Sequence, residues 1–262
     1  MFHDTLTIIA IAVAAAFASP LGGLIALWRT PTTLLMSVSL GFASGVLLAT
    51  IGFEMLPKAL ELGSWPVAVG GFMAGFSLVY GFDLFVHRGK LAGARADQYR
   101  QVERFYHAHR PRGGEVTVLA GGTIAEGLIE GLSIGAGAAI EPGIGLLIAL
   151  AIVIDNFSEG LSIGEIIRSE KSRSRKSEIG RVLGWTGLIG TAVLGSTLIG
   201  WFFLRGLAPP LLAFLFGIGA GGMFYLTVTD LVPLAEERQY QQAGAIAMGV
   251  GFMIIFVLST LL

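Results

Sequence analysis

Four acidic residues stand in two pairs within otherwise apolar segments. Glu126 and Glu130 are four residues apart in the run TIAEGLIEGLSIG, and Asp155 and Glu159 repeat that spacing in IVIDNFSEGLSIGE. Residues four apart lie on the same face of an α-helix, so each segment would present two carboxyl groups together. Asn156 adds an amide three residues before Glu159. We call Glu126, Glu130, Asp155 and Glu159 the four-acid cluster.

Carboxyl groups in apolar surroundings need a compensating partner, because an ionised group at the centre of a bilayer costs several kcal/mol. Neither segment contains a Lys or Arg that could pair with its acids. The acids could be protonated, could line water or could be neutralised by a cation. Two facing helices that each give two acids would form an oxygen-rich site suited to a divalent metal. The alternative is a set of protonated acids that hydrogen-bond between helices and serve packing alone.

Composition places these acids in a membrane protein. The chain has 262 residues, of which 54% are hydrophobic and only 13% are charged, whereas soluble domains carry roughly 25% charge. The absence of cysteine excludes a disulfide scaffold, a zinc-thiolate site and cysteine catalysis. The net charge of −1 gives no indication of a nucleic-acid partner. We therefore expect a polytopic protein whose main partner is the lipid bilayer.

Eight apolar stretches have about the 20 residues that a membrane-spanning helix needs. They lack the strict alternation of barrel strands, so an all-α membrane protein with eight transmembrane helices is predicted. The whole chain, 1–262, forms one transport domain with loops near 87–116 and 168–180. The spans are expected at 5–28, 33–57, 66–86, 117–139, 143–167, 181–204, 209–234 and 242–262.

Basic residues orient the helices. Most of them fall in two segments: Arg88, Lys90, Arg95, Arg100, Arg104, Arg110 and Arg112 in the first, and Arg168, Lys171, Arg173, Arg175, Lys176 and Arg181 in the second. With eight spans, both segments lie on the same side as Arg29 and Arg238, and only Lys58 and Arg205 lie opposite. The positive-inside rule puts the two loops in the cytoplasm and both termini outside.

Internal repetition indicates inverted-repeat architecture. EGLSIG occurs at 130–135 and again at 159–164, in the adjacent fourth and fifth spans. Similar residues also recur at an offset of 176 residues between the second and seventh spans. Matching sequences in oppositely directed spans are typical of transporters with a midplane site at the repeat interface. The alternative is a chance likeness between glycine-rich membrane helices. The offset pairs are Gly41/Gly217, Gly45/Gly221, Glu54/Asp230, Pro57/Pro233, Ala59/Ala235 and Glu61/Glu237.

Other polar residues give weaker signals. Glu54 and Asp230 stand just before Pro57 and Pro233, near the ends of their spans. The topology puts Glu54 toward the outside and Asp230 toward the cytoplasm. They could be vestibule acids that collect and release cations, or interfacial carboxylates that reach water. In the first cytoplasmic loop, His107 and His109 fit two incidental histidines better than a transient metal-ligand pair.

These motifs resemble the ZIP (Zrt/Irt-like) family of divalent metal transporters, in particular its bacterial branch. GVLLATIGFEMLPKALE and TVTDLVPLAEE are similar to the family's second and seventh spans. DNFSEG at 155–160 and EGLIEG at 126–131 align with its HNxPEG-like ligand motifs. The resemblance covers essentially the whole chain. It implies metal import into the cytoplasm, a homodimer and a place in the cytoplasmic (inner) membrane. It also implies that Glu126, Glu130, Asp155, Asn156 and Glu159 are the metal ligands.

The chain departs from the family pattern at several of these positions. Glu126 and Gly127 stand where the fourth span of the family has His-Asn, and Asp155 stands where the fifth usually has His. In the sixth span, Gly190 and Thr191 replace a Glu-Pro that often bridges a second metal, which favours one metal per protomer. The resemblance implies zinc or iron. An all-oxygen ligand set favours Mn²⁺, Mg²⁺ or Ca²⁺, with Fe²⁺ intermediate, so the preferred metal stays open.

Three classes of function fit paired membrane acids: metal transport, intramembrane aspartyl proteolysis and proton-coupled carriage of a substrate that is not a metal. The protease class is disfavoured because the GxGD signature is missing; YGFD at 80–83 lacks its second glycine. The chain also shows no nucleotide-binding motif, so movement must follow a gradient, the membrane potential or a coupled ion. We therefore predict a divalent metal transporter that is not an enzyme and needs no cofactor beyond the transported ion.

Overall fold

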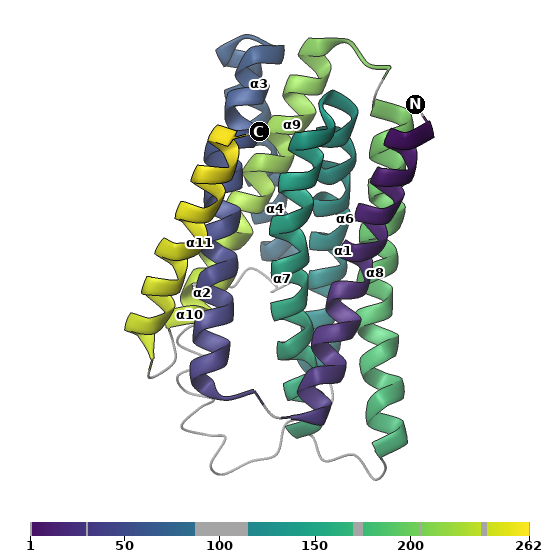
Figure 1. The fold of residues 1–262 in the computed structure, drawn as a ribbon, viewed down its shortest axis with the longest axis vertical. Helices are drawn as coiled ribbons and strands as arrows, with labels where there is room; N and C mark the ends of the chain where they lie inside the picture. Colours follow the sequence, from purple (N-terminus) through teal and green to yellow (C-terminus); the bar gives the residue numbers. More distant parts are fainter. Residues whose placement is uncertain are drawn as a thin grey trace.

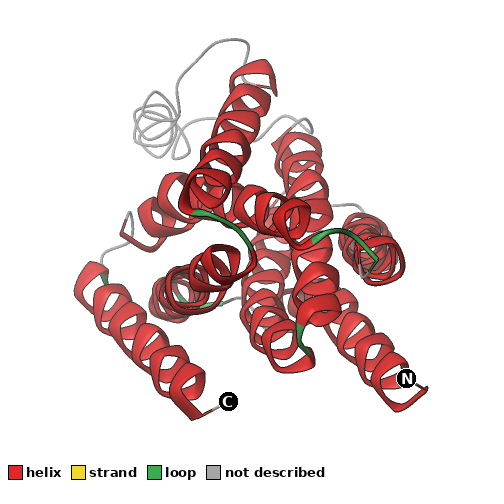
Figure 2. Ribbon diagram, turned by 90° about the horizontal axis from the view of Figure 1, so that it is seen from above, coloured by secondary structure: helices red, strands yellow, loops and turns green. Residues whose placement is uncertain are grey.

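Long helices that run side by side build the molecule (Figure 1). The computed structural model describes residues 2–29, 31–86, 115–169, 175–204, 206–236 and 240–261. Within these residues every regular element is helical, as Figure 2 shows from above. The all-α fold expected from the sequence is therefore confirmed.

Eight helical segments make up this bundle within the described residues. In chain order the helices are α1 (Phe2–Trp28), α2 (Thr33–Thr50), α3 (Leu56–Leu62), α4 (Trp65–Val86), α6 (Glu115–Ile140), α7 (Pro142–Ser169), α8 (Arg175–Leu204), α9 (Pro209–Leu226), α10 (Val232–Glu236) and α11 (Gln241–Leu261). Two π-helical turns, η1 (Ile51–Met55) and η2 (Thr227–Leu231), join α2 to α3 and α9 to α10.

Seven of these segments are long and apolar enough to cross a membrane. α6, with 26 residues, is the eighth and lies among them (Figure 1). The observed ends lie within a few residues of the expected spans, with two larger differences. The second span continues through α3 to Leu62, five residues beyond the expected end at 57. α8 begins at Arg175 rather than 181, because its first turns are polar and carry no hydropathy signal. Residues 175–180 of the expected second loop are therefore helical, while 87–114 and 170–174 lie outside the described residues.

Each π-helical turn comes just before a proline. Pro57 follows η1 by two residues, and Pro233 follows η2 by two residues. A proline inside a helix lacks the N–H group for one backbone hydrogen bond and crowds the carbonyl four residues earlier. A π turn widens the helix at this point and lets the chain continue past the proline. The two turns are separated by the same 176 residues as the sequence echo, so the repeated sequence produces a repeated irregularity.

Helix packing follows an inverted repeat. α2 packs against α11, while its repeat partner α9 packs against α4. In the same way, α1 packs against α7, while α8 packs against α6. Two groups result, one made of α1, α6, α7 and α8 and the other of the remaining long helices. The groups meet where α2 contacts α7 and where α6 contacts α9, which are again equivalent contacts in the two repeats.

Glycines allow these helix pairs to approach closely. A side chain at Gly131 would collide with the backbone of α8 at Val193, and one at Gly160 would collide with the carbonyl of Ser19 on α1. Both glycines follow the glutamate of an EGLSIG copy. Close glycine contacts are a common means of helix association in lipid, where apolar area gives little driving force. The repeated hexapeptide therefore fixes α6 on α8 and α7 on α1.

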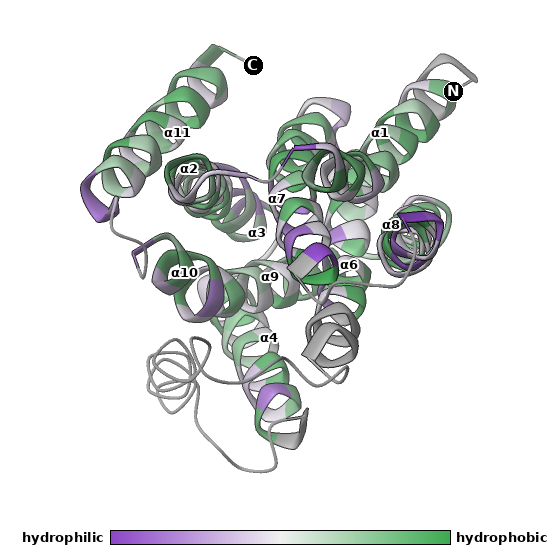
Figure 3. Ribbon diagram, turned by 90° about the horizontal axis from the view of Figure 1, so that it is seen from below, coloured by the Kyte–Doolittle hydropathy of each residue, from purple (hydrophilic) through white to green (hydrophobic). Residues whose placement is uncertain are grey.

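The outer surface of the bundle is apolar. Large hydrophobic side chains such as Phe17, Leu78, Phe203, Ile246 and Met253 are exposed on it. In Figure 3 the outlying helices α1 and α11 are mainly hydrophobic along their length. An apolar exterior on helices of this length is what a bilayer requires. The chain is therefore an integral membrane protein.

Candidate metal site

A tight hairpin brings the two acid pairs together. α6 ends at Ile140 and α7 begins at Pro142, so Glu141 alone joins them. The two helices run antiparallel and contact each other (Figure 1). Glu130 and Asp155 both fall near the middle of their helices. The hairpin therefore holds the two acid-bearing faces at the same depth.

A hydrogen bond links the two helices at the centre of the cluster. The Asn156 amide nitrogen donates to Glu130 Oε2 at 3.0 Å and to the carbonyl of Ile152 at 3.1 Å. Glu130 is 4% exposed and Asn156 is 1% exposed, so this contact is closed to the surroundings. An amide–carboxylate bond at this burial is stronger than a neutral one. It sets the distance between α6 and α7 at the acids.

The four-acid cluster gathers around this bond. Glu130 hydrogen-bonds to Asp155 across the two helices and interacts electrostatically with Glu126. Glu159 interacts with the other three acids, and among these it hydrogen-bonds to Glu126. Glu126 and Glu159 are half-buried, whereas Glu130 and Asp155 are buried. The structure thus brings all four predicted acids into one region.

The cluster is not a closed ligand shell. Within the described part of the chain, no point is surrounded at ligand distance by three or more His, Asp or Glu side chains. Carboxylates repel one another, so four of them do not converge on a point by themselves. The ligand geometry of the predicted set therefore stays a prediction.

Asp155 carries an unsatisfied oxygen at this site. Its side chain is 4% exposed, and Oδ1 has no hydrogen-bond partner among the described residues. A buried polar atom without a partner is rare and costs several kcal/mol in apolar surroundings. An oxygen of this kind is well suited to a cation as its partner.

The sixth-span position contributes no ligand. A side chain at Gly190 would collide with the carbonyl of Ala16, because α8 lies directly on α1 there. The neighbouring Thr191 is exposed and donates to the carbonyl of Leu188 at 2.8 Å. Packing therefore excludes an acid at position 190, whereas Thr191 is directed to the surface.

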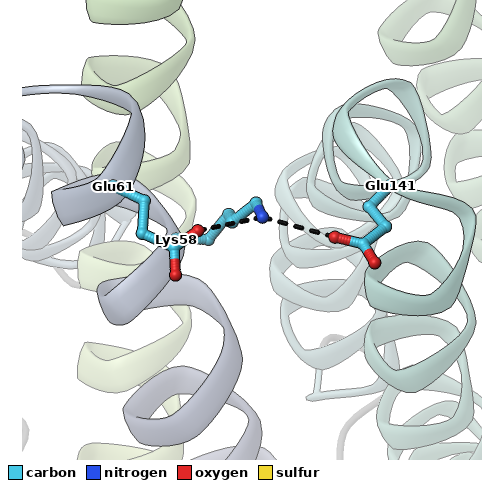
Figure 4. Close-up of polar contacts among 3 residues, drawn as sticks. All are labelled: Lys58, Glu61 and Glu141. Atoms are coloured by element: carbon cyan, nitrogen blue, oxygen red, sulfur yellow. Dashed lines mark hydrogen bonds and ion pairs between the residues drawn. The ribbon is translucent and has the colours of Figure 1, made fainter. Parts of the chain in front are cut away.

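A second acidic group lies at the end of the molecule where α6 meets α7. Lys58 Nζ contacts Glu61 Oε2 at 3.0 Å and Glu141 Oε2 at 3.3 Å (Figure 4). Glu54, which lies in η1, is half-buried and interacts with both Lys58 and Glu141. The Lys58–Glu141 pair connects the two helix groups. The side chain of Glu141 is 53% exposed, and ion pairs of this kind contribute about 0 to 1 kcal/mol to the stability of a fold. The pair therefore does little to hold the two helix groups together.

Asp230 lies in η2, the counterpart of the turn that holds Glu54. It is half-buried and interacts with Tyr225, whose hydroxyl donates to Asp83 Oδ2 at 2.9 Å. Neither Glu54 nor Asp230 is in the four-acid cluster. Their role as vestibule acids stays a prediction, and His107 and His109 lie outside the described residues.

Sequence reasoning missed one residue that contacts the site. Ser19 on α1 donates to the carbonyl and to Oδ1 of Asn156, both at 3.0 Å. A signal for it exists: SPLGG at 19–23 and STLIG at 196–200 match at Ser19/Ser196, Leu21/Leu198 and Gly23/Gly200. These pairs lie 177 residues apart, one more than the pairs of the second and seventh spans, and they extend the repeat to the first and sixth spans.

Comparison with known proteins agrees with this architecture. The family model described as ZIP zinc transporter matches residues 4–259. The zinc transporter ZupT of Corynebacterium efficiens is 29% identical over 265 residues, which cover 95% of this chain and 94% of that protein. The zinc transporter ZupT of Salmonella heidelberg is 28% identical over 218 residues, covering 80% of this chain and 79% of its own length. With eight helical segments in an inverted repeat and a family match over nearly its whole length, the chain belongs to the ZIP family of metal transporters.

Proposed function

We propose that this protein transports divalent metal cations of the zinc, iron or manganese type through the site between α6 and α7. Glu126, Glu130, Asp155 and Glu159 supply the carboxylate oxygens. Asn156 is the fifth proposed ligand, and its amide nitrogen donates to Glu130. The transported ion is the substrate, and no enzymatic step is involved.

The unsatisfied Oδ1 of Asp155 is the observation that carries this proposal. It lies in a group of four buried or half-buried acids, on two helices whose membrane-spanning parts contain no Lys or Arg. A divalent cation would neutralise two carboxylates and at the same time give Oδ1 of Asp155 a partner. It would also draw the mutually repelling acids toward one point. Protonated acids that serve packing would account for the hydrogen bonds Glu130–Asp155 and Glu126–Glu159, but they would leave Oδ1 of Asp155 without a partner.

The direction and assembly belong to the same proposal. We infer import into the cytoplasm across the inner membrane, by a homodimer with both termini outside. The distribution of basic residues supports this orientation, and the names of the relatives support zinc as one substrate. Glu54 would collect cations on the outer side and Asp230 would release them on the inner side. Because a carboxylate must be deprotonated to bind a metal, uptake would be coupled to the proton balance at the site.

Reconstitution into liposomes tests the proposal. Uptake of Zn²⁺, Fe²⁺, Mn²⁺, Cd²⁺, Mg²⁺ and Ca²⁺ is measured for the wild type and for Glu130→Ala and Glu159→Ala. Both variants should lose transport while still being inserted and folded, because each removes a ligand from the midplane. Glu165→Gln is the matched control, since it removes an acid from α7 beyond the cluster.

The result separates the candidate functions. Normal uptake by both alanine variants would show that the ion passes elsewhere. Absence of uptake of every metal by the wild type, together with proton movement, would point to a proton-coupled carrier for another substrate.

A further inference from the structure

Ser19 occupies a closed contact between α1 and α7. Its side chain is 1% exposed, and its backbone lies directly against Gly160. From this position its hydroxyl reaches Asn156 Oδ1 and the Asn156 carbonyl, each at 3.0 Å. The same asparagine donates to Glu130 on the other side. Ser19 is thus two hydrogen bonds away from a carboxylate of the four-acid cluster.

The orientation of the Asn156 amide is fixed by its neighbours. Its nitrogen faces Glu130 Oε2 and the carbonyl of Ile152, and both of these atoms accept hydrogen bonds. Its oxygen faces the hydroxyl of Ser19, which donates. A rotated amide would place an acceptor against two acceptors. The serine and the two acceptors therefore hold one amide orientation together.

The inverted repeat supplies an internal reference for this contact. Ser196 on α8 is the repeat partner of Ser19, and its hydroxyl donates to the carbonyl of Gly127 at 3.2 Å. Gly127 stands where the other repeat has Asn156. Both serines are buried and bridge equivalent helix pairs. Of the two serines, only Ser19 contacts a side chain that in turn hydrogen-bonds to an acid. Both serines therefore pack two helices together, but only Ser19 is linked to the four-acid cluster.

We propose that Ser19 is a positioning residue of the transport site. It holds the Asn156 amide so that the nitrogen donates to Glu130, and this presets the Glu130 carboxylate for the incoming cation. Preorganised ligands bind more tightly because less freedom is lost when the ion arrives. The proposal rests on metal transport as the proposed function and assigns to this site a residue on α1, outside the acid-bearing hairpin.

Ser19→Ala and Ser196→Ala form a matched pair of tests. Each removes one buried hydroxyl from an equivalent helix contact, and alanine is native at the nearby Ala15 and Ala18 of α1. Uptake kinetics in proteoliposomes and melting temperature in detergent are measured for both. Ser19→Ala should raise the KM for Zn²⁺ or Mn²⁺ by about three- to ten-fold with little change in maximal rate, as expected for the loss of one membrane-buried hydrogen bond. Ser196→Ala should leave KM within about two-fold of the wild type.

The outcomes separate this proposal from simpler ones. Equal changes of KM in the two variants, or a change in melting temperature alone, would show that Ser19 only packs helices. An unchanged KM in Ser19→Ala would overturn the assignment while transport itself stands. Failure of the wild type to take up any divalent metal would overturn the proposed function and this assignment with it.

Discussion

Carboxylate oxygen is the only ionisable ligand type in the four-acid cluster. Glu126 and Asp155 stand at the two positions where the aligned ligand motifs have histidine, so the site offers hard oxygens in place of imidazole nitrogens. Hard oxygen donors favour Mg²⁺, Ca²⁺ and Mn²⁺, whereas imidazole suits Zn²⁺. The identity of these two residues therefore bears directly on metal preference.

Replacing Glu126 and Asp155 with histidine should shift uptake toward Zn²⁺ relative to Mn²⁺. Two imidazoles would supply the softer ligands and would lower the negative charge of the site. Competition between the two ions in proteoliposomes measures the ratio, with Asp83→His as a control outside the cluster. An unchanged Zn²⁺/Mn²⁺ ratio would mean that these two side chains do not touch the ion.

At the scale of the helices, close glycine contacts hold the acids in place. Gly160 lies against the backbone of Ser19, and Gly131 lies against the backbone of α8. At the end of α7, Arg168 Nη1 donates to the last carbonyls of α1, at 3.0 Å from Leu27 and 3.2 Å from Ala26. These contacts set the register of α7 on α1, and with it the depth of Asp155 and Glu159.

Gly160→Ala should destabilise the protein, because the new methyl group would meet a backbone carbonyl that cannot move aside. Overpacking of this kind costs about 1 to 3 kcal/mol. Gly184→Ala on α8 is the control, since nothing lies within 4 Å of the added group. Alanine is favoured over glycine in a helix by up to about 1 kcal/mol, so this control should be neutral or stabilising. Melting temperatures in detergent compare the two, and equal values would contradict the close packing of α7 on α1.

At the scale of the whole molecule, the missing sixth-span acid bears on how many ions the proposed site can hold. Two unit charges 4 Å apart repel by about 4 kcal/mol at an effective dielectric of 20, and two divalent ions repel several times more strongly. A bridging carboxylate normally offsets this repulsion. Since Gly190 lies on the backbone of α1, no side chain from α8 can serve as that bridge at this position.

We therefore expect one tightly bound metal per protomer. The metal content of the detergent-purified protein, measured by mass spectrometry after dialysis against a weak chelator, gives the number directly. Anomalous diffraction from metal-soaked crystals then locates the ion. Two full-occupancy peaks between α6 and α7 would instead assign the bridging role to Glu126, whose charge replaces a neutral histidine of the aligned motif.

The helices and the family could be predicted from the sequence, because both depend on the order of residues along the chain and not on contacts between distant segments. A membrane-spanning helix is visible as a long stretch of high hydropathy, and the family is visible as a set of motifs in a fixed order. The structure confirms the all-α fold, and the family match confirms the family. The π turns before Pro57 and Pro233 were missed, since a change in helix width leaves no trace in hydropathy. The early start of α8 at Arg175 was missed for the same reason.

Contacts between spans that are far apart in the sequence were harder to predict than the helices. The acid pairs could be placed on one helical face from their spacing, and the structure brings them together. The bond from Ser19 to Asn156 joins residues 137 positions apart. Nothing in either local sequence marks the partner, and the likeness of 19–23 to 196–200 relates Ser19 to Ser196 but not to Asn156. The Lys58–Glu141 contact likewise depends on how two helix groups meet.

During insertion into the membrane, the single residue between Ile140 and Pro142 makes α6 and α7 one helical hairpin. Each of these helices alone would bring two acids to mid-bilayer, where insertion of one charged residue costs about 2.5 to 3.5 kcal/mol. Entering as a pair, they can turn their polar faces toward each other, as in the folded structure, where Asn156 donates to Glu130. The proposed site would then be assembled in the same event that places it in the lipid.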